Sequence, residues 1–392
     1  MAGYLFTLDS LESLTLCVTQ GLYATIVEPK RYRDGRGFYW GSPQEGTFAD
    51  YCTMKPEDNV YFFIQRKIYG IGELVAINNL DCKFLNYPNS SNPSLPSYEE
   101  IRTNLLLDNG SNNSIHLRWV CVFKPSPYFF QNGIDMDELL SSNPSEFKMV
   151  RALWRLSFIK FTDRENAAFK DAMLKYNEEA LIGTPLPALV FENSVEASHA
   201  RLSHAVTNDY LFKVIPILDS CSDGETVGHE MALEAGLLFQ LSREDEETIG
   251  VFGKWDYLSH QVIASPFKAI DYMDKMDVFG YRYVQGYRPI VSKYLVCELK
   301  KDEIQTDDVD QVMKYVDWIK QEYGKGDYSM IEAFLVGCSI PDHVQAYGRE
   351  YGKRQFTRGS RPAKNETWND LRFVEYRYDR NTEKVSFRRV DI

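Results

Sequence analysis

The spacing of apolar side chains predicts alternating helices and strands in the second half of the chain. Residues 229–241 and 307–323 have apolar side chains at helical intervals. Four runs are apolar or β-branched and typical of strands: residues 249–257, 277–281, 294–298 and 329–340. This order predicts an α/β domain with a mixed, mostly buried central sheet flanked by helices.

The first half has strand-like runs rich in aromatic and β-branched residues, at residues 22–27, 59–64 and 116–123. Residues 165–177 have helical spacing, whereas residues 86–97 (NYPNSSNPSLPS) have the composition of a loop. Strands with flanking helices predict an α+β domain, a small β-barrel with helical decoration.

These textures divide the chain into two domains, as expected for 392 residues. The first domain is predicted over residues 1–182. Residues 183–225 begin with GTPLPAL and end with DSCSDGET, which predicts a connector with some helix around residues 199–206. The second domain is predicted over residues 226–392.

The formal charge of -12 argues against a non-specific nucleic-acid binder, which needs basic surface to neutralise phosphates. The charge is uneven, however. Residues 344–392 contain 12 Lys or Arg against 7 Asp or Glu, which gives this stretch +5 and leaves -17 for the rest. A basic C-terminal extension beside an acidic body suits local contact with a phosphate backbone, or a metal that neutralises the carboxylates of the protein.

Cysteine and histidine spacing argues against a structural zinc centre. The seven cysteines form no CxxC pair, and none of the six histidines stands at zinc-finger spacing from a cysteine. Reduced thiols and a cytoplasmic location are expected, with no membrane partner, because no export signal or bilayer-length apolar run is present. His229, His260 and His343 are each expected at the surface or in a satisfied polar position.

Candidate chemistry begins with YLVCELKKD at residues 294–302. Strand alternation places Glu298 and Lys300 on the same face near the end of a strand. The carboxylate can hold a divalent cation there, and the ammonium can position a water or help to deprotonate it. The alternative is an ordinary ion pair at a sheet edge.

A second carboxylate, Asp277, opens the strand-like sequence DVFGY and can face Glu298 across a strand pair. Two such carboxylates would supply hard oxygen ligands for Mg²⁺. Asp274 is the fallback for this position, although a solvated turn or a helix cap is its more common role.

Two predicted helices add polar side chains that could join this site. Gln311 and Tyr315 lie four residues apart in the helix after Lys300 and share one face. Glu234 lies in the helix predicted over residues 229–241, with Glu230 one turn earlier. Each of these residues is also typical of the ordinary polar stripe of an amphipathic helix.

The order of these elements resembles the PD-(D/E)xK nuclease superfamily, in the branch with a QxxxY helix after the catalytic strand. The resemblance covers roughly residues 226–340 and implies a nuclease fold. It further implies that Glu234, Asp277 and Glu298 bind Mg²⁺ or Mn²⁺ and that Lys300 assists the attacking water. The glutamine and tyrosine of the QxxxY helix would support the site or contact the nucleic-acid backbone.

One departure from the family lies between Asp277 and Glu298. Family members often have a short hairpin there, whereas this chain has residues 280–293 (GYRYVQGYRPIVSK). Arg282 and Arg288 lie in this insertion among several tyrosines. They could follow a nucleic-acid backbone or simply cap the hairpin.

The first half contains MKPEDNVYFF and IYGIGELV within residues 50–77, and these sequences resemble PUA-like barrels of the EVE and ASCH type. The resemblance covers roughly residues 22–175 and implies recognition of modified bases or RNA, by an aromatic pocket that stacks on an extruded base. Tyr39 and Trp40, flanked by glycines, are the first candidates for its wall, and Trp119 is the second. The alternative is that these aromatics belong to the core.

Together the two resemblances imply a metal-dependent endonuclease that acts on DNA, with a base-sensing first domain, in restriction or antiphage defence. A homodimer is expected by analogy with nucleases that cut both strands. Two alternatives stay open: an inactive nucleic-acid-binding or scaffold protein, and an RNase. The chain has no GxGxxG or GxxxxGK[ST] phosphate loop and no GxSxG sequence.

Overall fold

The computed structural model describes residues 1–27, 30–31, 38–85, 98–102, 108, 110, 118–125, 133–148, 158–178, 187–264 and 274–390. The chain forms two compact units. Unit 1 comprises Met1–Pro29 and Met54–Lys213, and unit 2 comprises Lys30–Thr53 and Val214–Ile392. The segment Lys30–Thr53 therefore differs from the sequence prediction, which placed it in the first domain. Its helix α2 (Ser42–Cys52) packs on α9 (Glu230–Ser242) of unit 2.

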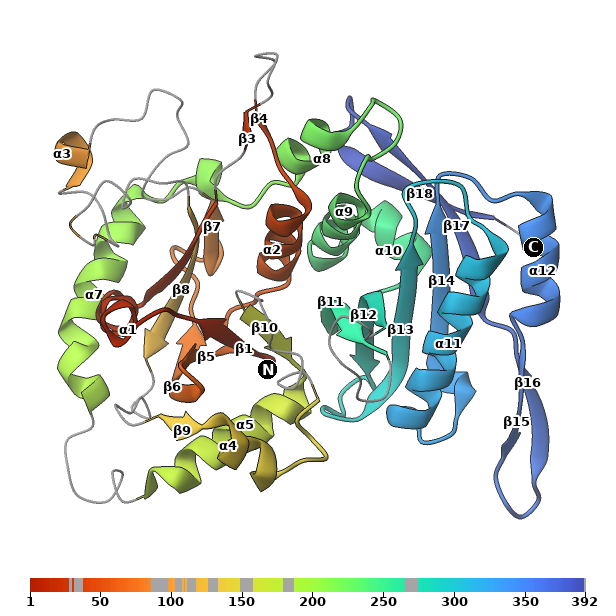
Figure 1. Cartoon of the computed structure of the whole chain (residues 1–392), viewed down its shortest axis with the longest axis horizontal. Helices are drawn as coiled ribbons and strands as arrows, with labels where there is room; N and C mark the ends of the chain where they lie inside the picture. The colour runs from red at the N-terminus through yellow and green to blue at the C-terminus, as the bar shows by residue number, and fades with distance from the viewer. Residues whose placement is uncertain are drawn as a thin grey trace. The chain divides into compact units, whose positions relative to one another are not determined.

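Unit 1 is built on a mixed sheet with the strand order β10-β1-β5-β6-β8-β2, which curls into a half-barrel (Figure 1). β1 pairs with β5 in parallel, and the other pairings along this path are antiparallel. The strands of this sheet among the described residues are β1 (Gly3–Thr7), β2 (Leu22–Ile26), β5 (Asn59–Ile64), β6 (Lys67–Leu74), β7 (Lys83–Leu85), β8 (Arg118–Pro125), β9 (Ile134–Asp135) and β10 (Phe158–Phe161).

Helices pack around this sheet, and one of them, α7 (Pro187–Ala205), lies in the predicted connector. The connector prediction is wrong, because unit 1 extends to Lys213 and unit 2 resumes at Val214. α7 places Leu202 in a core cluster with Leu22, Val120 and Val122 of the sheet. The described helices of unit 1 are α1 (Leu11–Gln20), α3 (Tyr98–Ile101), α4 (Met136–Ser142), α5 (Asp163–Tyr176), α7 (Pro187–Ala205) and the 3-10 turn η4 (Asn208–Tyr210). The predicted strands at residues 22–27 and 59–64 and the helix at residues 165–177 are confirmed, while the loop predicted at residues 86–97 lies outside the described residues.

Unit 2 is built on a second mixed sheet, with the order β11-β12-β13-β14-β17-β18. β13, β14 and β17 run parallel, and the other neighbours are antiparallel. The strands are β11 (Tyr257–Ile263), β12 (Lys275–Tyr283), β13 (Val291–Leu299), β14 (Ile331–Gly337), β17 (Leu371–Asp379) and β18 (Lys384–Val390). Two further sheets have two strands each. One pairs β3 (Lys30–Arg31) with β4 (Phe38–Tyr39), and the other pairs β15 (Arg354–Arg358) with β16 (Lys364–Trp368).

Helices cover both faces of this sheet, as the sequence predicted (Figure 1). On one face, Tyr323 at the end of α11 contacts Phe279 and Tyr294 of the sheet. On the other face, Phe252 of α10 lies 4.9 Å from Phe334, centroid to centroid. The described helices of unit 2 are α2, α8 (Ile215–Cys221), α9, α10 (Glu246–Phe252), α11 (Thr306–Glu322), η6 (Tyr328–Met330) and α12 (Asp342–Tyr351).

Residues 249–257 do not form the predicted strand. Most of this run belongs to α10, and β11 begins only at Tyr257. The side chain of Asp245 accepts a hydrogen bond from the backbone N–H of Thr248, which caps the helix, and Gly253 ends it with φ of +83°. Ile249 and Phe252 are three residues apart, an interval that fits a helical face as well as an apolar strand.

The basic C-terminal extension is also different from its prediction, because much of it is part of the sheet. β17 buries Phe373, Val374 and Tyr376. Several of its basic residues are paired: Arg354 contacts Asp317, and Arg388 contacts Glu375. The Arg388–Glu375 pair lies within the stretch and is already counted in its +5, whereas the Arg354–Asp317 pair offsets one positive charge with an acid from outside the stretch.

Across the described residues, no helix combines the length and the apolar character that crossing a membrane requires.

Candidate active site

The two carboxylates predicted to face each other do so, at one end of the sheet in unit 2. Val278 pairs with Cys297 in the antiparallel β12–β13 ladder, so Asp277 and Glu298 occupy the next facing positions. The backbone N–H of Leu299 donates to Oδ2 of Asp277 over 2.7 Å, which fixes this carboxylate at the strand end. Half of the residues from 280 to 293 lengthen the two strands to nine residues each, and residues 284–290 connect the strands.

Glu234 approaches the same place from α9, and its side chain is almost fully buried. Nε2 of Gln261 donates to Oε1 of Glu234 over 2.9 Å and to Oδ1 of Asp277 over 3.3 Å. Gln261 has φ of +51°, a left-handed conformation that is costly for a residue with a side chain. A strained residue of β11 therefore places one amide group between two carboxylates.

Lys300 follows directly after β13 and connects the carboxylates to α11. Its Nζ donates to Oε1 of Glu298 over 2.7 Å and to Oε1 of Gln311 over 3.4 Å. Nε2 of Gln311 in turn donates to the hydroxyl of Tyr315 over 2.8 Å. The structure thus brings the residues of the ExK and QxxxY sequences into one hydrogen-bonded chain.

A buried histidine holds Glu234 from the other side. Nε2 of His260 lies 2.9 Å from Oδ1 of Asp50 on α2, and its Nδ1 lies 3.4 Å from Oε2 of Glu234. Burial acts to lower the pKa of His260, but Asp50 and Glu234 outweigh it and raise this pKa to about 10. His260 is therefore an imidazolium ion near neutral pH, in a satisfied polar position rather than at the surface.

The carboxyl groups share a raised affinity for protons. Burial raises the pKa of Asp277 well above its ordinary value, and the charges of Glu234 and Glu298 raise it further. Burial also raises the pKa of Glu298, to about 7, against the effect of Lys300, and raises the pKa of Glu234 against the effect of His260. For Lys300, burial acts to lower the pKa, but the charge of Glu298 outweighs it and the pKa is raised.

These residues fit a divalent cation. Oε2 of Glu298 is buried and has no hydrogen-bond partner, and such an oxygen costs free energy unless a proton or a cation compensates it. Carboxylate oxygens are the ligands that Mg²⁺ and Mn²⁺ prefer. Glu234, Asp277 and Glu298 do not form a triad whose ligand atoms all lie within 4.8 Å of one another. Direct ligation fits Asp277 and Glu298, which occupy facing positions of neighbouring strands, while the amide of Gln261 lies between Glu234 and Asp277.

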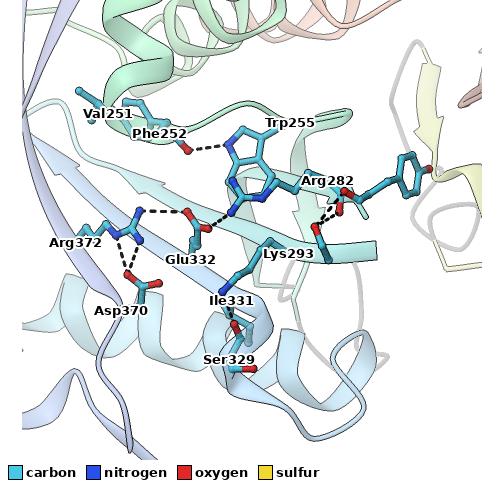
Figure 2. Close-up of polar contacts among 12 residues, drawn as sticks. Val251, Phe252, Trp255, Arg282, Lys293, Ser329, Ile331, Glu332, Asp370 and Arg372 are labelled. Carbon is cyan, nitrogen blue, oxygen red and sulfur yellow. Dashed lines mark hydrogen bonds and ion pairs between the residues drawn. The ribbon is translucent and has the colours of Figure 1, made fainter. Parts of the chain in front are cut away.

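The two arginines of the insertion lie away from this site. Arg282 is five residues from Asp277 along β12, which corresponds to about 17 Å at roughly 3.4 Å per residue. It pairs with Glu332, which also pairs with Arg372, and it stacks over Trp255 (Figure 2). Arg288 is exposed and lies over the ring of Tyr283.

The predicted base pocket is not assembled as expected. Trp119 has 1% of its surface exposed and packs against Phe212 inside unit 1, so the core alternative is correct for this residue. Trp40 belongs to the segment that packs with unit 2, as does Tyr39, whose side chain lies outside the described residues. Asp274, the fallback ligand, is exposed just before β12, whereas Asp277 holds the site position.

Three residues of the site were not predicted: Asp50, His260 and Gln261. The spacing of His260 from the other histidines indicates no metal site, and the sequence YLSHQVI gives no signal for the role of Gln261. Asp50 lies 210 positions before His260, and the packing of α2 against α9 and β11 connects them.

No protein-family model and no curated protein matches this chain. Among solved structures, a hypothetical protein from Leishmania major matches with 12% identity and a TM-score of 0.27, over 45% of this chain and 97% of that one. A protein from Pseudomonas putida matches with 14% identity and a TM-score of 0.25, over 44% of this chain and 99% of that one. At these scores neither match supports a functional argument.

Proposed function

We propose that unit 2 is a metal-dependent phosphodiester hydrolase that cuts nucleic acid, with DNA as its substrate. One observation supports this above all: Asp277 and Glu298 face each other beside Lys300, and a buried oxygen of Glu298 has no hydrogen-bond partner. An ordinary ion pair needs one acid and one base. Here Glu234, Asp277 and Glu298 share only two cations, Lys300 and His260, and His260 also pairs with Asp50. This leaves an excess of negative charge, which a divalent cation would compensate.

Each residue then has a role that follows from its contacts. Asp277 and Glu298 would hold Mg²⁺ or Mn²⁺. Such an ion would supply Lewis-acid activation of a water and of the phosphoryl oxygen. Lys300 keeps its proton at neutral pH because its pKa is raised, so it acts as a cationic donor toward the water or a phosphate oxygen and not as a base.

The remaining residues position this group. The ammonium of Lys300 donates both to Glu298 and to Gln311, and Gln311 in turn donates to Tyr315, which holds the glutamine in place. Gln261 links Glu234 to Asp277, so Glu234 acts on the ion indirectly, through this amide or through water. Loss of a positioning residue should therefore lower the rate less than loss of Asp277 or Glu298.

The decisive experiment is cleavage by the purified full chain. Supercoiled plasmid, linear duplex DNA, single-stranded DNA and RNA are each incubated with Mg²⁺, with Mn²⁺ or with EDTA. Cleavage of DNA should require the metal and disappear in Glu298→Gln and Lys300→Met. The matched controls are Glu375→Gln, at a solvent-accessible ion pair of the same sheet, and Lys301→Met, at the next position. Both controls should cut normally.

The outcomes separate the competing functions. Metal-dependent cleavage of RNA alone would replace the deoxyribonuclease with an RNase. Binding of nucleic acid without cleavage under any metal would favour an inactive binding or scaffold protein. Cleavage that persists in Glu298→Gln would refute the proposed site. Base sensing by unit 1 is not included in the proposal, because Trp119 is a core residue.

A further inference from the structure

Three helices of unit 2 bring together a second group of side chains that could bind a metal. Unlike the candidate active site, whose ligands would be carboxylates, this group combines a carboxylate, a thiol and an imidazole. Glu45 lies in the first turn of α2, Cys221 ends α8, and His229 precedes the first residue of α9. One ligand atom from each lies within 4.8 Å of the other two, and Nδ1 of His229 is 2.7 Å from Oε1 of Glu45. Among the described residues, this is the set of three that meets the distance requirement.

Glu45 supplies an independent sign that something else binds here. Its side chain has no exposed surface, and Oε2 is buried without a hydrogen-bond partner. His229 satisfies only the other oxygen. A carboxylate oxygen left bare in the interior is costly, and a coordinated cation would remove that cost. The side chain of His229 is 40% exposed, which leaves the group a route to solvent.

The ligand types indicate which metal would bind. A thiolate, an imidazole and a carboxylate together are typical of Zn²⁺, whereas Mg²⁺ avoids sulfur. Zinc–ligand bonds of about 2.0 to 2.3 Å in a tetrahedral site place ligand atoms roughly 3.3 to 3.8 Å apart. The present separations, from 2.7 Å to at most 4.8 Å, bracket that range, so small side-chain movements suffice.

We propose that Glu45, Cys221 and His229 form a zinc site, with the fourth position open to water. The site would join α2 to α8 and α9 inside unit 2. α2 also carries Asp50, which holds His260, and α9 carries Glu234, which His260 contacts. The zinc would thus brace the two helices that position the acidic side of the candidate active site. The spacing of cysteines and histidines along the chain predicts no structural zinc site. That spacing cannot reveal this group, because Glu45 lies 176 positions before Cys221.

The test measures metal content in the full-length chain, purified without chelators and then reconstituted with Zn²⁺. We expect one zinc per chain by mass spectrometry in the wild type, in Glu298→Gln and in the matched control Cys338→Ser. Cys221→Ser and Glu45→Gln should lose it. The Glu298→Gln variant removes the candidate active site, so the result does not depend on nuclease activity.

Cobalt substitution gives a second readout that a merely structural cysteine would not produce. Co²⁺ bound to a thiolate shows a sulfur-to-metal charge-transfer absorption, which should appear in the wild type and in Glu298→Gln and be absent in Cys221→Ser. If the wild type binds no zinc on reconstitution, or shows no charge-transfer absorption with Co²⁺, the zinc site is refuted. The wild-type measurement stands even where a substitution prevents folding. Zinc retained at one per chain by Cys221→Ser would refute it equally.

Discussion

Replacing Glu298 by glutamine should stabilise the metal-free protein, although it should abolish catalysis. Glu298 has 1% of its surface exposed and shares its site with Asp277 and Glu234. A glutamine has nearly the same shape. Its amide oxygen can still accept from Lys300, while its NH₂ group can donate to Asp277 where the carboxylate repels it. An ordinary structural Glu–Lys pair would respond in the opposite way, because it would lose its attraction.

The expected gain in the free energy of unfolding follows from the pKa of Glu298, which burial raises from 4.5 to about 7. A raised pKa means that the folded state prefers the protonated acid, so ionisation costs stability. That cost is absent below about pH 4.5, grows through pH 7 and is complete above it. At about 1.4 kcal/mol for each pH unit, the cost at pH 8 is about 3 kcal/mol. The variant should gain most of this amount, a rise in Tm of roughly 5 to 10 °C for a unit of this size.

The assay is thermal or urea unfolding in EDTA at pH 5 and pH 8, followed by circular dichroism. Wild type and Glu298→Gln should be similar at pH 5 and differ at pH 8. Glu332→Gln is the contrasting control, since this acid lies between Arg282 and Arg372 and its neutralisation should destabilise the protein (Figure 2). A Glu298→Gln variant less stable than wild type at pH 8 would show that burying the ionised Glu298 carboxylate does not cost stability, and the argument for a cation would fail.

Four further outcomes are expected. Added Mg²⁺ or Mn²⁺ should raise the Tm of the wild type more at pH 8 than at pH 5.5, because protons compete for carboxyl groups whose pKa values are raised; an equal shift at both pH values would contradict this. His260→Gln should destabilise unit 2 by about 2 to 4 kcal/mol in urea unfolding, because it leaves Glu234 and Asp50 without their shared cation. Trp119→Ala should lower the free energy of unfolding by about 3 to 5 kcal/mol without changing which modified DNA is cut. A changed preference among modified DNA substrates would restore the base-pocket hypothesis. Light scattering should give the mass of a homodimer if both strands are cut by paired sites, and a monomer that makes double-strand breaks would count against that expectation.

The sequence predicted the central pairings of unit 2 because they follow from strand alternation and helix spacing. Glu298 and Lys300 are two positions apart at a strand end, and Gln311 and Tyr315 are four apart on a helix, so each pair meets through local geometry alone. Asp277 required one further step, the register of neighbouring strands. These rules are local, and they do not depend on which helix packs on which.

The parts that the sequence missed depend on distant packing or on unusual backbone. Asp50 contacts His260 because α2, although it lies early in the sequence, belongs to unit 2. Gln261 reaches two carboxylates only because its φ is +51°, which no strand pattern predicts. The apolar run at residues 249–257 is typical of a strand, but the side chain of Asp245 caps a helix that includes most of this run.

The charges around the candidate active site suggest how many cations it is built for. Asp50, Glu234, Asp277, Glu298 and Asp308 contribute five negative charges when ionised, and His260 and Lys300 contribute two positive charges in contact with them. The remainder is three negative charges. One divalent cation neutralises two of them, and the third is that of Asp308, which lies 3.7 Å from Lys300 and keeps 15% of its side-chain surface in solvent. A second divalent ion would leave an excess of positive charge in a buried site, which is as costly as the excess of negative charge that it replaces. The arrangement therefore favours chemistry with one metal ion, with Lys300 supplying the second positive centre that a two-metal site would obtain from its other ion.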